Sequence, residues 1–298
     1  MISRRLFLAA GPVTLIAVCA RRASAFAPPA PANTGVKLGC QTNAWRIDPD
    51  DFTQVLAVLN KLKELGFTGF ETGFRNLQGQ FGNAAAARKQ IEQTGLQFFG
   101  AHIFLDKYDQ QTRIAPLDLI QKVAAGAAAL GAQRLIVSGG GLIQDGKVED
   151  SALQRKAAGL NAAARYCRSQ GLRLAYHNHG PEFAADGLEI EGLFRLTDPG
   201  LVDFLTDCGW ASRAGINVPE FFSRHHRRLS GLHLRDFKDD TQVPLGQGAF
   251  PLKELAAVIR RVKWNGWVLT EEERLSGEKP GARAVAPARQ ALRQVFGK

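Results

Sequence analysis

The chain alternates short apolar runs with segments of helical periodicity, and it does so eight times. Each run reads as a strand, because it is apolar along its length and is bounded by Gly, Pro or polar residues. Strands that are apolar on both faces are typical of parallel sheets covered by helices. The sequence therefore predicts one closed (β/α)8 barrel, a TIM barrel of the α/β class. The predicted strands span residues 36–45, 67–74, 97–105, 135–138, 172–177, 202–206, 229–234 and 267–270.

The segments between these runs carry apolar residues at helical spacing. Phe52, Val55, Leu56, Leu59 and Leu62, for example, fall on one face of a helix. An open, doubly wound sheet is the alternative, but it would be expected to carry a Gly-rich nucleotide-binding turn after an early strand, and the sequence has none. Further helices are predicted over residues 83–94, 116–130, 151–169, 219–227, 252–262 and 287–296.

The first 27 residues have the pattern of an export signal. Arg4 and Arg5 precede an apolar stretch over residues 6–20, and small residues that fit an A-x-A cleavage site follow it. The stretch is shorter than the ~20 apolar residues of a comfortable membrane span, and the paired arginines resemble the twin-arginine export signal. We expect a signal peptide over residues 1–27, a Pro/Ala linker over 28–35 and the barrel over 36–298. The mature protein is expected to be periplasmic or secreted, without a membrane span.

The charge pattern and the cysteine content indicate whether a nucleic-acid partner or a disulfide framework is to be expected. The formal net charge is +10, but four of the arginines lie in the predicted signal peptide. The remaining basic residues are scattered and form no stripe interleaved with aromatic residues, so no nucleic-acid partner is expected. Cys40, Cys167 and Cys208 remain in the predicted mature chain, an odd number on distant segments. This indicates buried thiols and no disulfide framework.

Four consecutive predicted strands each deliver one potential metal ligand to the same rim of the barrel. Glu182 lies just past the fifth strand, Asp207 follows the sixth, His233 lies on the seventh and Glu271 ends the eighth. The carboxyl ends of barrel strands meet at one face, where TIM barrels carry their active sites. Three carboxylates and one imidazole suit one divalent ion, with Mn, Co or Mg favoured and Zn as an alternative.

Several segments together resemble the xylose-isomerase-like sugar phosphate isomerase/epimerase superfamily. The resemblance covers the chain after Val36. It lies in Y-H-N-H-x-x-E-F at residues 176–183, D-x-x-W at 207–210 with A-G at 214–215, H-L-x-D at 233–236 with Arg235 in place of lysine, G-x-G at 246–248 and W-x-x-x-E at 267–271. It implies a TIM barrel whose metal ligands are Glu182, Asp207, His233 and Glu271. At the fifth strand, His177 or His179 is an alternative or supporting ligand.

Other residues at the strand ends are expected to contact substrate. Aromatic walls suit the faces of sugars, and histidines next to carboxylates suit either substrate binding or support of the metal ligands. The predicted substrate-binding residues are Trp45, Glu71, His102, His177, His179, Trp210, Arg235 and Asp236.

A metal beside carboxylates can stabilise the enediolate that forms when a proton leaves the carbon between a carbonyl and a hydroxyl. Glu182 and Glu271 are the predicted acid–base pair. Return of the proton gives an epimer or an isomer, and loss of a β-substituent gives dehydration or cleavage of an oxidised glycoside. Because phosphorylated sugars are kept in the cytoplasm, an exported member is expected to act on a non-phosphorylated sugar or keto-sugar.

Two other classes remain open. Endonucleases for abasic DNA resemble this chain in fold, but they carry more metal ligands, and export argues against DNA. A sugar-binding barrel without catalysis is the second alternative, since binding alone could use the same metal. A homo-oligomer is compatible with the sequence, which does not choose between oligomeric states.

Overall fold

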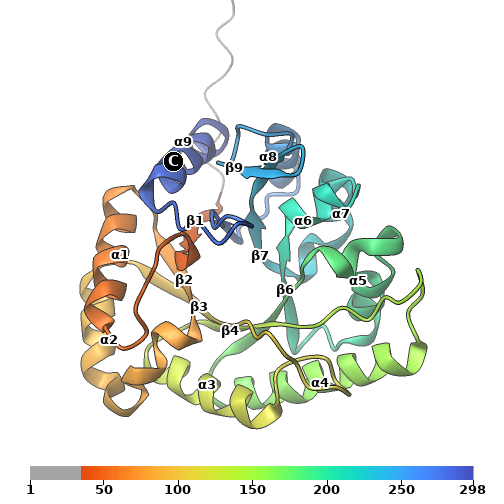
Figure 1. Ribbon diagram of the computed structural model, residues 1–298, viewed down its shortest axis with the longest axis horizontal. Coiled ribbons are helices and arrows are strands. Elements are labelled where there is room, and N and C mark those ends of the chain that lie inside the picture. Colours follow the sequence, from red (N-terminus) through yellow and green to blue (C-terminus); the bar gives the residue numbers. More distant parts are fainter. Residues whose placement is uncertain (1–34, 298) are drawn as a thin grey trace, which may run out of the picture. The chain divides into compact units, whose positions relative to one another are not determined.

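The computed structural model describes residues 35–297, and these form a closed barrel of eight parallel strands (Figure 1). The predicted TIM barrel is confirmed. The order around the barrel is β1-β10-β7-β6-β5-β4-β3-β2, so that the first and last strands pair and close the sheet. The strands are β1 (Lys37–Gln41), β2 (Gly69–Gly73), β3 (Gln97–Ile103), β4 (Arg134–Ser138), β5 (Arg173–His177), β6 (Val202–Asp207), β7 (Leu229–Leu234) and β10 (Trp267–Thr270).

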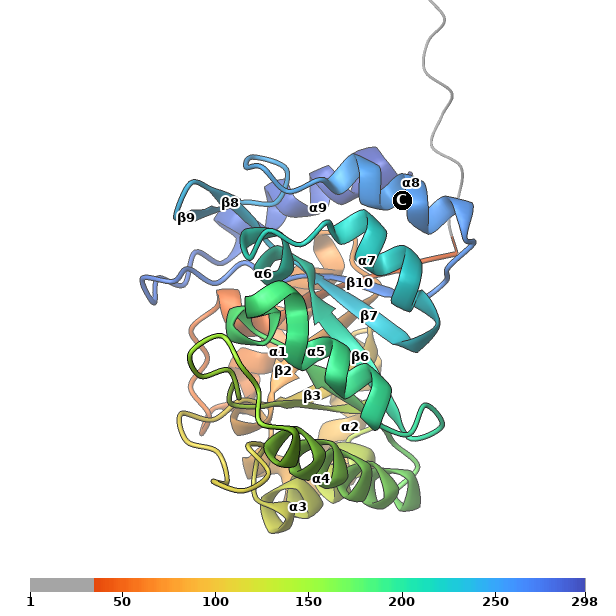
Figure 2. The ribbon, with the colours of Figure 1, turned by 90° about the vertical axis from the view of Figure 1, so that its right-hand side faces the viewer.

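Helices surround the barrel on all sides (Figures 1 and 2). They are α1 (Phe52–Glu64), α2 (Ala84–Gln93), α3 (Leu117–Ala129), α4 (Asp150–Ser169), α5 (Ala184–Leu196), α6 (Cys208–Arg213), α7 (Val218–His225), α8 (Leu252–Arg261) and α9 (Ala282–Phe296). Helix α9 lies beside α1 and closes the ring (Figure 1), and Arg289 of α9 donates hydrogen bonds to the carbonyl oxygen of Gly66 just after α1.

The structure adds elements that the sequence did not predict. Helices α5 and α6 were missed, and α9 begins five residues before the predicted start at 287. A two-stranded antiparallel hairpin, β8 (Asp236–Lys238) and β9 (Thr241–Val243), follows β7. Three-residue strands leave no alternation long enough to detect in a sequence.

Two apolar layers hold the barrel together. The larger one lies between strands and helices, and a smaller cluster comprises Phe99, Ile136, Ala175, Leu205, Trp267 and Leu269. Side chains alternate between the two faces of a strand. Ala175, Leu205 and Leu269 belong to the smaller cluster, so the residues two positions further along, at the carboxyl ends of β5, β6 and β10, project on the same side, into the mouth of the barrel.

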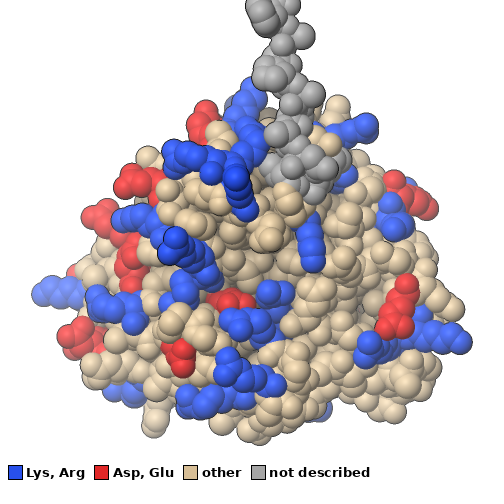
Figure 3. Space-filling view, turned by 180° about the vertical axis from the view of Figure 1, so that it is seen from behind, with Lys and Arg blue, Asp and Glu red and all other residues tan. Residues whose placement is uncertain are grey.

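The predicted signal peptide and linker lie outside the described residues, except for Gly35. No helix within residues 35–297 combines the length and apolar character needed to cross a membrane. On the face turned away from the viewer in Figure 1, Lys and Arg side chains predominate, with Asp and Glu between them (Figure 3). The cysteines predicted to be buried thiols, Cys40, Cys167 and Cys208, are free and buried.

Candidate functional site

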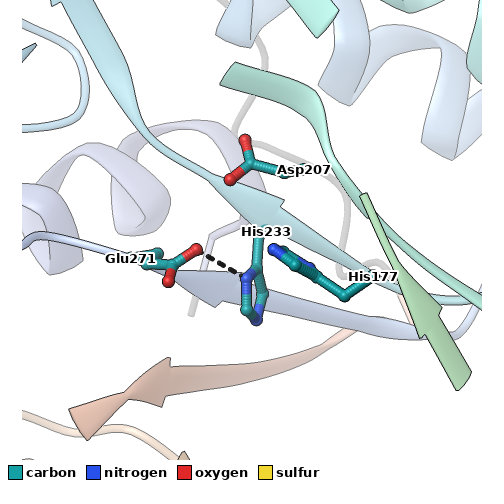
Figure 4. A group of neighbouring side chains, drawn as sticks. All are labelled: His177, Asp207, His233 and Glu271. Atoms are coloured by element: carbon teal, nitrogen blue, oxygen red, sulfur yellow. Dashed lines mark hydrogen bonds and ion pairs between the residues drawn. The ribbon is translucent and has the colours of Figure 1, made fainter. Parts of the chain in front are cut away.

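The carboxyl ends of β5, β6, β7 and β10 bring four potential ligands together. His177, Asp207, His233 and Glu271 each offer one nitrogen or oxygen atom, and these atoms all lie within 4.8 Å of one another. Figure 4 shows the four side chains approaching each other from neighbouring strands. Asp207 pairs with His233 across β6 and β7 because the two strands run in parallel register. All four residues are buried.

Two atoms of this group have no hydrogen-bond partner. They are Nε2 of His177 and Oδ2 of Asp207, both buried. A buried polar atom without a partner costs free energy, and a bound cation would remove that cost. Nδ1 of His177 lies 3.2 Å from the carbonyl oxygen of Leu205, which favours the tautomer whose free electron pair is on Nε2. Burial lowers the pKa of His177 well below its usual value, so the ring is neutral. These atoms fit a divalent metal ion.

His233 lies between two carboxylates. Its Nδ1 is 2.7 Å from Oε2 of Glu271, and its Nε2 is 2.7 Å from Oε2 of Glu71. Burial lowers the pKa of His233, but the two carboxylates outweigh burial and raise it to about 10. The ring can therefore hold a proton between the carboxylates, and it can ligate a metal only when it releases one of its protons.

Arg235 bridges two members of the group. Its Nε lies 2.8 Å from Oδ2 of Asp207 without the alignment of a hydrogen bond, and its Nη2 contacts Glu271. Burial raises the pKa of the Glu271 carboxyl, but Arg235 and His233 together hold it well below its usual range. Arg235 also lies over the Trp210 ring, 5.5 Å from its centroid. A cation that binds Asp207 and Glu271 therefore shares these two carboxylates with the guanidinium group of Arg235.

Glu182, predicted as a metal ligand and as an acid–base residue, is not brought into this group. It follows β5 in the short turn Gly180–Phe183, where Oε1 accepts a hydrogen bond from the Tyr176 hydroxyl at 2.7 Å and Oε2 accepts one from the His179 backbone N–H at 3.2 Å. Tyr176 belongs to the apolar layer under the helices, on the other side of β5 from His177. At the end of the fifth strand, the residue that joins the group is His177, the alternative ligand predicted from the sequence.

Glu182 belongs instead to a buried polar cluster outside the barrel lumen. Lys156 of α4 lies 4.0 Å from Glu182 and 2.5 Å from Oε1 of Glu189, and it donates a hydrogen bond to the carbonyl oxygen of Gly140 at 3.0 Å. Burial raises the pKa of Glu182, and the nearby ammonium group of Lys156 opposes that rise. The cluster connects α4, α5 and the loop after β4 to the end of β5.

A cavity of about 620 Å³ opens beside the group of four candidate ligands, and Glu271 is the member of the group that lines it. Of the predicted substrate-binding residues, the cavity is lined by Trp45, His102, His179, Trp210 and Arg235. His177 and Glu71 do not line it. Glu71 lies behind the cavity wall, with Oε1 2.8 Å from Nδ1 of His102 and Oε2 next to His233.

Asp236, also predicted to bind substrate, organises a loop. Its two carboxylate oxygens accept hydrogen bonds from four backbone N–H groups, those of Phe237, Gly246, Gly248 and Phe250, at 2.8–2.9 Å. A Cβ atom at Gly248 would lie 2.3 Å from Asp236 Oδ1, so only glycine fits there. Gly248 of the G-x-G segment therefore allows the backbone to approach the Asp236 carboxylate this closely.

Asn43 is a site residue that the sequence did not single out. Its Nδ2 donates a hydrogen bond to Oε1 of Glu271 at 2.6 Å, and it lines the cavity beside Gln41. Both residues lie at the carboxyl end of β1. This position at a strand end was the sequence signal that could have identified them as site residues. Uncharged amides are also common at such positions as helix caps, so the signal does not indicate function by itself.

Residues 59–295 match the xylose isomerase-like TIM barrel family. The chain belongs to this family. It is similar to the inosose dehydratase of Geobacillus kaustophilus, with 27% identity over 256 residues that cover 75% of this chain and 81% of the relative.

Two solved structures share the fold. One is the IolI protein with a bound zinc atom, with a TM-score of 0.69 and 14% identity over 88% of this chain and 98% of that one. The other is the 3-keto-D-glucoside 4-epimerase YcjR of E. coli, with a TM-score of 0.65 and 16% identity over 88% of this chain and all of that one. At these identities, the likeness concerns the fold alone.

Proposed function

We propose that this protein is a divalent-metal-dependent isomerase or epimerase that acts on a non-phosphorylated sugar or keto-sugar by proton transfer through an enediolate. The observation that carries the proposal is the buried group of His177, Asp207, His233 and Glu271, with two ligand atoms that lack a hydrogen-bond partner, beside a cavity large enough for a small molecule. Mn, Co and Zn suit this donor set of two carboxylates and two imidazoles better than Mg, which prefers oxygen ligands.

The bound ion would supply stabilisation of negative charge on neighbouring carbonyl and hydroxyl oxygens of the substrate. Glu271 lines the cavity and is ionised, so it can accept the proton from the carbon between those oxygens. Burial lowers the pKa of His179 to about 3, so this ring is neutral and can donate a hydrogen bond to an oxygen that gains charge. Return of the proton to the other face gives an epimer, and return to the neighbouring carbon gives an isomer.

Dehydration is the second candidate, and a specific observation favours it. The Geobacillus relative is an inosose dehydratase, and removal of a proton next to a ketone is the shared first step of epimerisation and of water loss. A keto-sugar with a leaving group on the β-carbon would eliminate it from the same intermediate.

Isotope exchange tests the proton transfer. Metal-loaded protein incubated in heavy water with a panel of keto-sugars is expected to place deuterium on the carbon next to the carbonyl, as read by NMR. Glu271→Gln should slow the exchange by ~10²–10⁴-fold, as removal of a general base does. Glu254→Gln, an exposed change on α8, is the matched control and should leave the rate unchanged. Binding of the keto-sugars without any exchange would instead identify a sugar-binding barrel.

We also propose that the chain is exported by a twin-arginine signal over residues 1–27, on the basis of Arg4, Arg5 and the A-x-A sites. Intact-mass analysis of the periplasmic protein should give a mass that lacks this segment. Arg4→Lys with Arg5→Lys should retain the uncleaved precursor in the cytoplasm. A periplasmic protein of full-length mass would contradict cleavage, and unchanged export of the double variant would contradict the twin-arginine route.

A further inference from the structure

Two large apolar side chains are exposed at the mouth of the cavity. Phe104, just after β3, is 48% exposed, and Leu275, in the loop after β10, is 50% exposed, and both line the cavity. In residues 35–297, the other exposed large apolar side chains are Leu117 and Leu188, and neither lines the cavity. Apolar surface that stays exposed beside a binding site is typical of a contact surface for a ligand.

Polar contacts of their own loops hold both side chains at the mouth. The carbonyl oxygen of Phe104 accepts a hydrogen bond from Nη1 of Arg75 at 3.1 Å. The Phe104 ring lies 5.3 Å from the His179 ring, measured between centroids. In the loop with Leu275, the Gly277 N–H donates to the carbonyl oxygen of Arg274 at 2.8 Å, and Lys279 pairs with Glu273 at 3.3 Å. The loops therefore present these residues outward instead of folding them into the core.

The cavity thus changes character from its floor to its mouth. Its floor carries the polar groups Asn43, His102, Arg235 and Glu271, next to the candidate metal ligands. Its mouth is bounded by Phe104 and Leu275, with partly buried Ile47 and Trp45, and three exposed basic residues also line the cavity: Arg46, Arg75 and Lys279. A single ligand that extends from the floor to the mouth therefore contacts polar groups at one end and the apolar side chains of Phe104 and Leu275 at the other.

We propose that the mouth is a binding subsite for the apolar aglycone of an oxidised glycoside, whose keto-sugar unit lies at the floor. The sugar half of this inference rests on the proposed function, and the apolar subsite rests on Phe104 and Leu275. Continuity of one cavity of about 620 Å³ supports an occupant that joins both parts, because pockets of ~300–1,000 Å³ accommodate ligands larger than a single sugar ring.

Matched ligands test the subsite. Binding of the methyl and phenyl 3-keto-β-glucosides to manganese-loaded protein is measured by calorimetry, and the phenyl compound should bind about tenfold more tightly because its ring is buried against apolar side chains. Phe104→Ser with Leu275→Ser should abolish this preference and leave methyl glucoside binding unchanged. Leu188→Ser replaces an equally exposed leucine on α5 and should keep the preference. Equal affinity of the wild type for both compounds would overturn the proposal.

A second measurement separates this inference from the proposed function. If neither glucoside binds, the proposed function fails for this substrate class, and the fluorescence of 1-anilinonaphthalene-8-sulfonate then decides on the subsite alone. The dye should bind wild type and Leu188→Ser and should lose most of its binding in the Phe104/Leu275 double variant. Equal dye binding by all three proteins overturns the subsite. A wild-type dimer in sedimentation that the double variant cannot form also overturns it, because the occupant is then a second copy of the chain.

Discussion

His177 and Glu182 lie five residues apart, yet they project on opposite sides of the barrel wall. His177 ends β5 two positions after Ala175 of the inner apolar cluster, whereas Glu182 folds back onto Tyr176, which faces the helices. Strand alternation could have selected His177, because residues two apart on a strand share a face, but it does not locate Glu182, which lies in the turn after β5. The sequence prediction instead followed the family pattern and the preference of hard cations for carboxylates, and these arguments do not locate a side chain after the strand has ended.

This difference leads to a prediction at the level of single residues. His177→Ala is expected to weaken metal binding by at least ~100-fold, because loss of a group that merely supports a ligand already costs ~10–100-fold. Glu182→Gln is expected to retain the metal, since it changes no atom of the ligand group, and its amide oxygen can still accept the hydrogen bond from the His179 backbone N–H. Calorimetry with Mn²⁺ or Zn²⁺ measures both variants. The reverse order of affinities would return Glu182 to the metal site.

At the level of elements, prediction was best where apolar contrast was strongest. The ranges of β7 and β10 were predicted to the residue: β10 is an apolar run that Glu271 ends, and β7, although it contains Ser230 and His233, lies between the charged Arg228 and Arg235. Helix α5 was missed because its first turn contains three consecutive positive φ values at Ala185, Asp186 and Gly187, and a second glycine, Gly192, weakens the helical signal further. Tertiary packing against α4 stabilises α5. A Cβ at Gly192 would lie 2.4 Å from Leu153 of α4, so the glycine permits close contact between the two helices.

Asp236 gives a prediction for the loop between β9 and α8. Asp236→Ala would leave four backbone N–H groups without their acceptor, and each unsatisfied buried group costs ~1–3 kcal/mol unless water reaches it. We expect a loss of about 3 kcal/mol or more in the free energy of unfolding, with faster amide hydrogen exchange over residues 244–250. Asp240→Ala, at an exposed ion pair with Arg213, is the control and should change stability by less than ~1 kcal/mol. Unchanged exchange in Asp236→Ala would mean that the loop is held by other contacts.

At the level of the whole molecule, the location of the site followed from topology. Parallel strands in a closed barrel bring their carboxyl ends to one face, so Asp207, His233 and Glu271 meet although they are far apart in the chain. The contacts of Arg235 and Asn43 with Glu271 could not be predicted, because they depend on side-chain conformations across the lumen. The apolar mouth formed by Phe104 and Leu275 also escaped prediction, since each lies in an irregular loop whose shape depends on its own hydrogen bonds.

The convergence of four strands on one candidate metal site predicts coupling between metal binding and stability of the whole barrel. A ligand that binds only the folded chain adds ~2.7 kcal/mol at a concentration of 100 Kd, and ~1 kcal/mol corresponds to about 2–4 °C in a domain of 150–250 residues. Mn²⁺ or Zn²⁺ at that concentration should therefore raise the midpoint of thermal unfolding by about 5–11 °C relative to protein in EDTA. His177→Ala combined with Asp207→Ala should abolish the rise, because these residues supply the two buried atoms without a partner. Calorimetric scans of both proteins, with metal or with EDTA at the same ionic strength, measure the midpoint of unfolding. An equal rise in the double variant would place the bound metal elsewhere on the chain, and no rise in the wild type would contradict a metal site at these residues.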